Sequence, residues 1–260
     1  TYYGVDQVTL KLEPASAELS DIDSDKDGIA DNIEGYKDSD KDGIPNYLDN
    51  IDACNVVPEQ VDTTTNFLIE GDPGVCLRLG DAALADQSGG VQLLSGDVGE
   101  NAENVGGIFD FIAYGLPVNG QEYRVVLPQI QPIPANAVYL KQNSDGIWQN
   151  FVEDSANQLW SSAGEPGFCP PPGSGEWQLG LTEGHWCVQL VMSDGGPNDA
   201  DGMANGAIVD PGGVAVITSS NQRPDAQDDL AETRLNTSLV IDVLANDSDA
   251  DGDALTIVNA

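Results

Sequence analysis

Residues 23–50 read DSDKDGIADNIEGYKDSDKDGIPNYLDN, and one acidic pattern occurs twice in this segment, beginning at Asp23 and again at Asp38. Each copy places carboxylates at alternate positions, follows them with a glycine, and ends in a further carboxylate. An acidic run normally stays unfolded, because like charges repel one another. The regular spacing therefore predicts that bound cations supply the positive charge that the segment lacks.

The pattern is D-x-D-x-D-G-x-x-[DN]-x-x-[ED], which is the spacing of a calcium-binding loop. Alternate side chains converge as such a loop curls, glycine at position 6 permits the sharp turn, and the carbonyl of position 7 adds a ligand. With the acid at position 12, each copy offers the roughly six to eight oxygens that Ca²⁺ prefers. We therefore expect at least two calcium ions as cofactors. The predicted ligands are Asp23, Asp25, Asp27, Ile29, Asp31 and Glu34 in the first copy, and Asp38, Asp40, Asp42, Ile44, Asn46 and Asp49 in the second.

The two copies are not expected to be EF-hands. An EF-hand needs a helix on each side of its loop, but only three residues separate the copies, and Pro45 lies inside the second. The segment instead resembles thrombospondin type-3 repeats over about residues 21–54. The resemblance implies a rigid spacer wrapped around calcium, in which Asp21 and Asp52 bridge adjacent ions. The alternative is a disordered acidic linker.

The chain as a whole is strongly acidic, with 9 Lys+Arg against 44 Asp+Glu and a formal charge of -35 over 260 residues. Nucleic acid is therefore not expected as a partner, because phosphate binding needs a basic face. No apolar run is long enough to span a membrane, so this segment is not expected to insert directly into one. For the acids scattered through the middle of the chain, a solvated surface that aids solubility is as good an explanation as a specific role.

Short apolar runs between turn signals predict an antiparallel β-sandwich, so the chain is expected to be mainly β. Its 29 glycines and 15 prolines favour many turns. In the run 185–192, alternation places Cys187 on one face of a strand and Val188 on the other. The expected strands are 75–79, 107–116, 122–128, 137–142, 148–153, 185–192 and 213–218.

The four cysteines predict disulfides and an oxidising compartment, because their number is even and the chain is rich in turns. Spacing favours the pairs Cys54–Cys76 and Cys169–Cys187, although four cysteines allow three connectivities. Free or metal-binding thiols are the alternative. A zinc site is disfavoured because the sequence has no CxxC.

Three stretches in the middle of the chain resemble a bacterial surface domain. They are LPQIQPIPANAVYLK (127–141), GFCPPPG (167–173) with GLTEGHWCVQLVMSDGGPNDADG (180–202), and NGAIVDPGGVAV (205–216). Together they are similar to the choice-of-anchor (U-type) β-sandwich domain, over about residues 56–219. The resemblance implies a secreted, surface-attached protein and implies no particular chemistry.

No catalytic motif is present, and an enzyme is not expected. The only histidine, His185, is expected to be a packed or hydrogen-bonded structural residue, and G-x-S-x-G, P-loop and H-E-x-x-H motifs are absent. The four tryptophans favour core packing, with sugar stacking as the alternative. Asp194, Asn198, Asp199 and Asp201 form either a third calcium loop or a turn held by side-chain hydrogen bonds.

The tail resembles the opening of an Ig-like or cadherin-like repeat of large bacterial adhesins, over about residues 224–260. TSLVIDVLANDSDADGDALTIV (237–258) predicts two strands around an acidic turn, and 221–229 reads as a linker. The alternating acids of that turn either converge on calcium or form a solvated turn. They are Asp247, Asp249, Asp251 and Asp253.

The expected organisation is therefore modular. Residues 1–20 form a strand or linker from a preceding module, 21–55 the calcium repeats, 56–219 the sandwich, and 220–260 a linker and the beginning of the Ig-like repeat. We expect a calcium-stabilised structural or adhesive segment of a secreted protein on a bacterial surface. Its partners would be neighbouring modules or other copies of the chain. The alternatives are a module that binds surface glycan or peptide, and a filament subunit assembled by strand addition.

Overall fold

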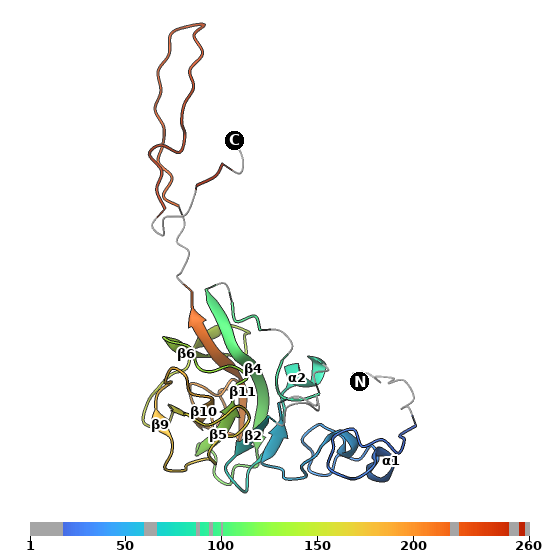
Figure 1. Cartoon of the computed structure of the whole chain (residues 1–260). Helices are drawn as coiled ribbons and strands as arrows, with labels where there is room; N and C mark the ends of the chain where they lie inside the picture. The colour runs from blue at the N-terminus through green and yellow to red at the C-terminus, as the bar shows by residue number, and fades with distance from the viewer. Residues whose placement is uncertain are drawn as a thin grey trace, which may run out of the picture.

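The computed structural model describes residues 18–59, 67–86, 89–93, 96–99, 101–218, 224–249 and 255–257. Its main body is a β-sandwich of two antiparallel sheets, as the sequence predicts (Figure 1). Of the strand or linker expected at 1–20, residues 1–17 lie outside the described residues.

The first sheet has the strand order β1-β2-β5-β10-β8-β9, and the second has the order β3-β4-β11-β6-β7. All neighbouring pairs are antiparallel. The strands of the first sheet are β1 (Val56–Pro58), β2 (Leu68–Gly71), β5 (Glu122–Pro128), β10 (Cys187–Ser193), β8 (Gln158–Ser162) and β9 (Gln178–Leu179). Those of the second are β3 (Cys76–Leu79), β4 (Ala102–Tyr114), β11 (Ala207–Ile217), β6 (Ala137–Gln142) and β7 (Trp148–Asn150). Within the described residues, three short helical elements accompany them: α1 (Asp31–Glu34), the 3-10 helix η1 (Asn46–Leu48) and α2 (Asp81–Asp86).

The main hydrophobic core lies between the two sheets. Alternate residues of β5 and β10, such as Val125 and Leu190, face alternate residues of β4 and β11, such as Phe111 and Val214, and all four are fully buried. Period-two alternation places such residues on one face of each strand. Each buried side chain of this size stabilises the fold by about 1.5–3 kcal/mol.

The outer face of β10 is also covered. Cys187 forms a disulfide with Cys169 and packs with Trp177, so that the loop before β9 covers the first sheet. Gln189, on the same face, accepts a hydrogen bond from the backbone N–H of Gly173 at 2.7 Å. The second disulfide joins Cys54 to Cys76, and both pairs are those that the spacing favours.

Most expected strands occur where the sequence places them, and 122–128 and 137–142 match β5 and β6 throughout. The strand expected at 185–192 begins two residues later, at Cys187. The strands β1, β2, β8 and β9 and the helix α2 were not expected. They are short, and β9 is a two-residue edge strand whose pairing with β8 depends on residues distant in sequence.

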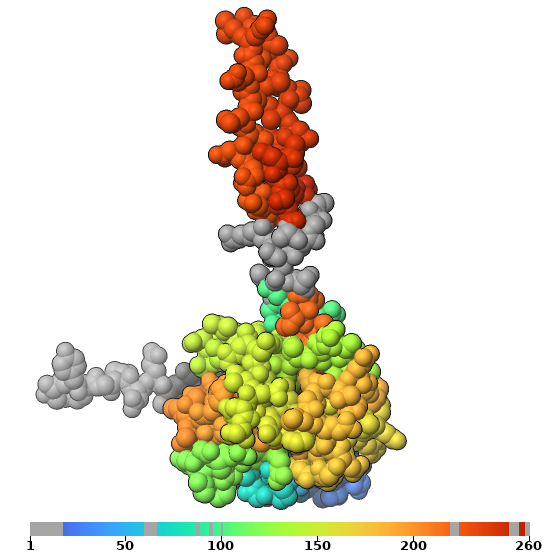
Figure 2. All heavy atoms as spheres, turned by 90° about the vertical axis from the view of Figure 1, so that its left-hand side faces the viewer, coloured from blue at the N-terminus to red at the C-terminus, as the bar shows by residue number. Residues whose placement is uncertain are grey.

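The tail differs from the prediction. Over 224–249 the structure contains no strand at 239–244, only an isolated bridge between Asp225 and Ser248. Figure 2 shows these residues as a narrow column. Leu230 is 99% and Val240 94% exposed. An extended segment that buries no apolar face is marginal in water, which explains why no strand forms at 239–244.

The disulfides lead to the first prediction. Replacing both Cys54 and Cys76 with serine should lower the free energy of unfolding by about 3 kcal/mol, because the closed loop restricts the unfolded chain. Urea denaturation of the oxidised protein measures the loss, with the double serine variant of Cys169 and Cys187 as the comparison. Peptide mapping that recovered free thiols in protein kept from reductant would contradict both the pairing and the expected loss.

Candidate metal centre

The two acidic loops, Asp23–Glu34 and Asp38–Asp49, have the same internal hydrogen bonds. In the first loop, Asp23 accepts backbone N–H groups of Lys26 at 2.7 Å and Gly28 at 3.1 Å. Asp27 accepts the N–H of Ile29 at 2.6 Å. The loop therefore curls around its own carboxylates, as a calcium-binding loop must.

The second loop repeats this geometry residue by residue. Asp38 accepts the N–H groups of Lys41 at 2.7 Å and Gly43 at 3.2 Å. Asp42 accepts the N–H of Ile44 at 2.7 Å. Gly43 has a φ of 103°, in the left-handed region that favours glycine, so position 6 has the conformation that the motif requires.

Several carboxylate oxygens in the loops have no hydrogen-bond partner. The acids at positions 1, 3 and 5 of each loop bring oxygens within 4.8 Å of one another. Buried oxygens of Asp25, Glu34, Asp40 and Asp42 lack a partner. Buried acceptors without partners cost about 1–3 kcal/mol each, and more when charged. These residues fit a hard divalent cation, which would satisfy those oxygens and offset their mutual repulsion.

The side chains at position 9 form hydrogen bonds to a serine of the same loop, whereas ligation would require them to face a cation. Asp31 accepts hydrogen bonds from the N–H and the Oγ of Ser24, both at 2.8 Å. Asn46 likewise accepts the N–H of Ser39 at 2.9 Å and donates to its Oγ. Each of these two predicted ligands thus forms hydrogen bonds across its own loop, to the serine at position 2. The sequence analysis did not predict a role for that serine.

Acids from both loops lie near one another. Burial raises the pKa of Asp49 to about 7, and the charges of Asp40, Asp52 and Asp25 add to the effect. Asp49, at position 12 of the second loop, is thus influenced by carboxylates from both loops and by Asp52. Asp21 instead accepts a hydrogen bond from the Asn32 amide at 2.6 Å. Of the two residues expected to bridge adjacent ions, Asp52 is therefore the one whose charge acts on an acid of the loops.

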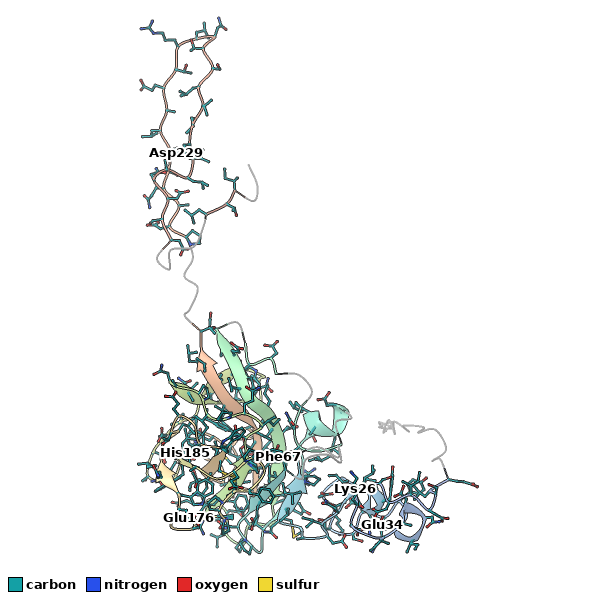
Figure 3. All side chains as sticks on the ribbon, in the orientation of Figure 1. Lys26, Glu34, Phe67, Glu176, His185 and Asp229 are labelled. Carbon is teal, nitrogen blue, oxygen red and sulfur yellow. A yellow bond between two sulfur atoms is a disulfide. The ribbon has the colours of Figure 1, made fainter. Side chains whose placement is uncertain are left out.

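At position 12 of the first loop, burial raises the pKa of Glu34 to about 7, and the charges of Asp25, Asp27, Asp31 and Asp23 contribute. Figure 3 shows Glu34 and Lys26 on this acidic segment. Since most of these charges belong to the converging acids, Glu34 lies where it can complete the same ligand set. Ile29 and Ile44 stand at position 7, directly after the glycines.

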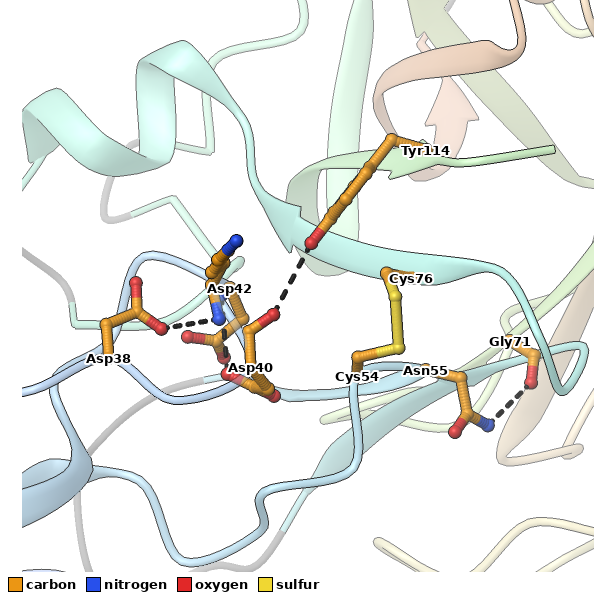
Figure 4. Close-up of a disulfide and its surroundings, with 9 residues drawn as sticks. Asp38, Asp40, Asp42, Cys54, Asn55, Gly71, Cys76 and Tyr114 are labelled. Atoms are coloured by element: carbon orange, nitrogen blue, oxygen red, sulfur yellow. Dashed lines mark hydrogen bonds between the residues drawn. A yellow bond between two sulfur atoms is a disulfide. The ribbon is translucent and has the colours of Figure 1, made fainter.

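The second loop is attached directly to the sandwich (Figure 4). The carbonyl of Asp42 accepts the N–H of Leu79 at 2.8 Å, and the carbonyl of Asp40 accepts the hydroxyl of Tyr114 at 3.4 Å. Ile44, 2% exposed, belongs to the main hydrophobic core. The disulfide Cys54–Cys76 ties the end of the acidic segment to β3. The loop is therefore part of the packed body.

The acids at 194–201 form a hydrogen-bonded turn. Asp194 accepts the N–H groups of Gly120, Asn205 and Gly206, at 2.8–3.0 Å. Asp199 accepts those of Gly195 and Val209 at 2.8 and 3.0 Å. The side chain of Asn198 bonds the backbone of Val152, and Asp201 bonds Met203 and Asn205. These side chains hold local backbone, which favours the turn over a third calcium loop.

Of the four acids expected in the tail site, Asp247 and Asp249 lie within the described residues. Asp247 accepts the backbone N–H of Gln227 at 2.8 Å. Asp251 and Asp253 lie outside the described residues. A calcium site in the tail therefore stays a prediction.

His185 has a structural contact. Its Nδ1 lies 3.0 Å from the Oγ of Ser161, which in turn donates to the carbonyl of Gly180 at 2.7 Å. Ser161 is fully buried. A serine whose hydroxyl hydrogen is committed to a carbonyl is poorly placed as a nucleophile, so this pair does not resemble a hydrolytic triad.

Comparison with known families matches residues 221–260 to a bacterial Ig domain. The chain matches no curated protein and no solved structure. Within the described residues, no helix combines the length and apolar character needed to cross a bilayer. The match and the two disulfides are consistent with an extracellular surface protein.

The crowded carboxylates lead to the second prediction. In calcium-free buffer, the free energy of unfolding should fall as pH rises from about 4 to about 8. Burial raises the pKa of Asp42 to about 8, and those of Asp49 and Glu34 to about 7, whereas unfolded carboxyls titrate near pH ~4. Over this window the folded state binds more protons, so each deprotonation destabilises it.

Denaturant titrations in EDTA at several pH values measure this slope. With saturating calcium the sign should reverse, because the bound ion favours the ionised acids and protonation releases it. A free energy of unfolding that rose with pH in EDTA over the same window would contradict the assignment of raised pKa values to these acids.

Proposed function

We propose that the chain is a calcium-stabilised structural or adhesive segment of a secreted modular protein on a bacterial surface. The observation that carries the proposal is the duplicated acidic loop, in which Asp23 and Asp38 accept matching backbone N–H groups and several buried oxygens have no partner. Two cations bound there would offset part of the negative charge of the loops and would link them, since Asp49 is near acids of both.

A rigid spacer follows from how the second loop is attached. Ile44 is in the core, and the loop backbone pairs with Leu79. Ordering the loop by calcium would therefore stiffen the junction with the sandwich as well as the loop itself. Such a junction suits a protein that extends or assembles a surface structure under load.

The surface location is supported by two features. The bacterial Ig domain match covers residues 221–260, and both disulfides form between the pairs predicted by spacing. Disulfides persist in oxidising compartments, which include the bacterial periplasm and cell surface. The proposed partners are neighbouring modules of the same protein or further copies of the chain. Nucleic acid does not fit, because the chain is strongly acidic and phosphate binding needs a basic face.

The third prediction tests calcium. At a concentration of about 100 times Kd, each ion should add about 2.7 kcal/mol to the free energy of unfolding and raise the melting temperature. Asp25→Ala should remove part of this gain by disabling the first loop, and Asp40→Ala should do the same for the second. Asp145→Ala, in an exposed turn, is the matched control and should keep the full gain. Calorimetry that showed equal melting temperatures in calcium and in EDTA would sink the proposal.

A second candidate function is ligand binding on the outer face of the first sheet. A groove of about 430 Å³ lies there, between the covering loop and the sheet. The Arg124–Asp72 ion pair, at 2.9 Å, lies in this groove beside Trp160 and Trp177. Polar side chains beside an aromatic wall suit a carbohydrate, which stacks on the ring and accepts hydrogen bonds.

The fourth prediction separates this candidate from a purely structural role. If the groove binds sugar, a glycan array probed with the whole chain should give signals that Trp160→Ala abolishes. Trp148→Ala, which alters a tryptophan on the other sheet, is the matched control and should leave them unchanged. An array without signal for the native chain would remove the carbohydrate hypothesis.

A further inference from the structure

Lys141 and Asp210 meet inside the sandwich. They lie on β6 and β11, which are neighbours in the second sheet, and Lys141 pairs directly with Gly212. Asp210 precedes Gly212 by two residues, so its side chain projects from the same face of the sheet as that of Lys141. The Nζ of Lys141 contacts the Oδ1 of Asp210.

Gly212 provides the room for this contact. A Cβ at that position would lie 2.6 Å from Cε1 of Tyr139 and 3.0 Å from Oδ1 of Asp210. A larger residue opposite Lys141 would therefore collide with the aromatic ring and with the carboxyl group. The glycine leaves the space in which the lysine side chain can reach the aspartate.

The pair is closed to solvent and lies beside aromatic residues of the main core. The side chain of Lys141 is 2% exposed and that of Asp210 is 0% exposed. On β4, Phe111 pairs with Asp210 and Phe109 with Gly212, and both phenylalanines belong to the main core. A lysine and an aspartate at this depth pay a large desolvation cost, which their attraction offsets only if their remaining polar groups are also satisfied.

Those remaining groups are not satisfied in an ion pair. Among the described residues, Nζ has one hydrogen-bond partner, Asp210, although an ammonium group has three donors. The Oδ2 of Asp210 is buried without a partner. Each buried group left in this way costs about 1–3 kcal/mol. An amide would carry one N–H and one carbonyl, and would remove both charges.

We propose that Lys141 and Asp210 are joined by an intramolecular isopeptide bond between Nζ and Cγ. A proton passes from the ammonium to the carboxylate, which gives the neutral amine and the carboxylic acid. The amine lone pair attacks Cγ and forms the N–C bond. The C–O bond then breaks, and the oxygen leaves as water with the carboxyl proton and one proton from Nζ. The reaction needs no oxidant or co-reactant.

The site favours the neutral reactants. Burial lowers the pKa of Lys141 well below its ordinary value, although the charges of Asp199 and Asp110 act in the opposite direction. Those two carboxyls are held by backbone N–H groups, Asp199 by Val209 and Gly195 and Asp110 by Ala83. Asp210 is therefore the carboxyl that is placed for attack.

The bond would link strands that are far apart in the sequence. Lys141 and Asp210 are 69 residues apart, and β11 is the strand that precedes the match to a bacterial Ig domain. The link would fasten this last strand covalently to its neighbour β6. This inference does not depend on calcium, so its failure would leave the proposed calcium role untouched.

The test is the mass of the intact chain after reduction and denaturation. We expect it to be lower than the sequence mass by one water molecule. A mass equal to that of the sequence would overturn the proposal. Cyclisation at an Asp-Gly step also loses water, but that product reopens in mild alkali. A deficit that disappears under those conditions would likewise count against the isopeptide bond.

Peptide mapping locates the bond. Trypsin should fail to cleave after Lys141, and further digestion with a glutamate-specific protease should leave the Lys141 peptide joined to the Asp210 peptide. Lys141→Met should restore the full mass, whereas the matched control Lys37→Met, on the exposed acidic segment, should retain the deficit. If Lys141→Met does not fold, the linked peptide from the native chain still decides. Recovery of separate, unmodified Lys141 and Asp210 peptides would refute the inference.

Discussion

The burial of Asp42 constrains how the acidic segment is joined to the sandwich. Its side chain is fully buried, one of its oxygens has no partner, and its carbonyl pairs with Leu79 of β3. Ile44, two residues later, enters the main core. A change in the protonation or ion binding of the second acidic loop therefore alters the stability of the sandwich. A cation in this loop would stabilise the fold itself, and its loss would place uncompensated charge next to apolar packing.

Local pattern explains why the loops and much of the sandwich could be predicted from the sequence. The spacing of Asp38, Asp40 and Asp42 is set by backbone geometry within a few residues, and the alternation in β5 is equally local. The disulfides could be predicted because both pairs are close in sequence. The role of Asn46 was missed because it depends on Ser39, a residue type that the calcium motif leaves unspecified.

Contacts between distant residues could not be predicted in the same way. The pairing of Lys141 with Gly212 is a matter of register between β6 and β11, which no local pattern fixes. The strand β8 was missed because QLWSS lacks clear alternation, although Leu159 and Ser161 are buried in the folded protein. In the tail, propensity suggested strands, but Leu230 and Val240 have no facing layer among the described residues. Propensity alone does not order a strand that buries nothing.

The order of strands in the second sheet indicates how a pulling force would pass from the acidic loops to the end of the sandwich. The acidic segment is fastened to β3, and the chain leaves the sandwich by β11, with only β4 between them. β4 and β11 are the two longest strands and pair antiparallel over most of their length. A pull along the chain would thus be carried from the loops through β3 and β4 to β11. The disulfide Cys54–Cys76 secures the first step of that path. The Lys141–Asp210 contact, on the far side of β11, secures the last strand to β6. Each end of the path is therefore held by a side-chain contact in addition to the hydrogen bonds between strands.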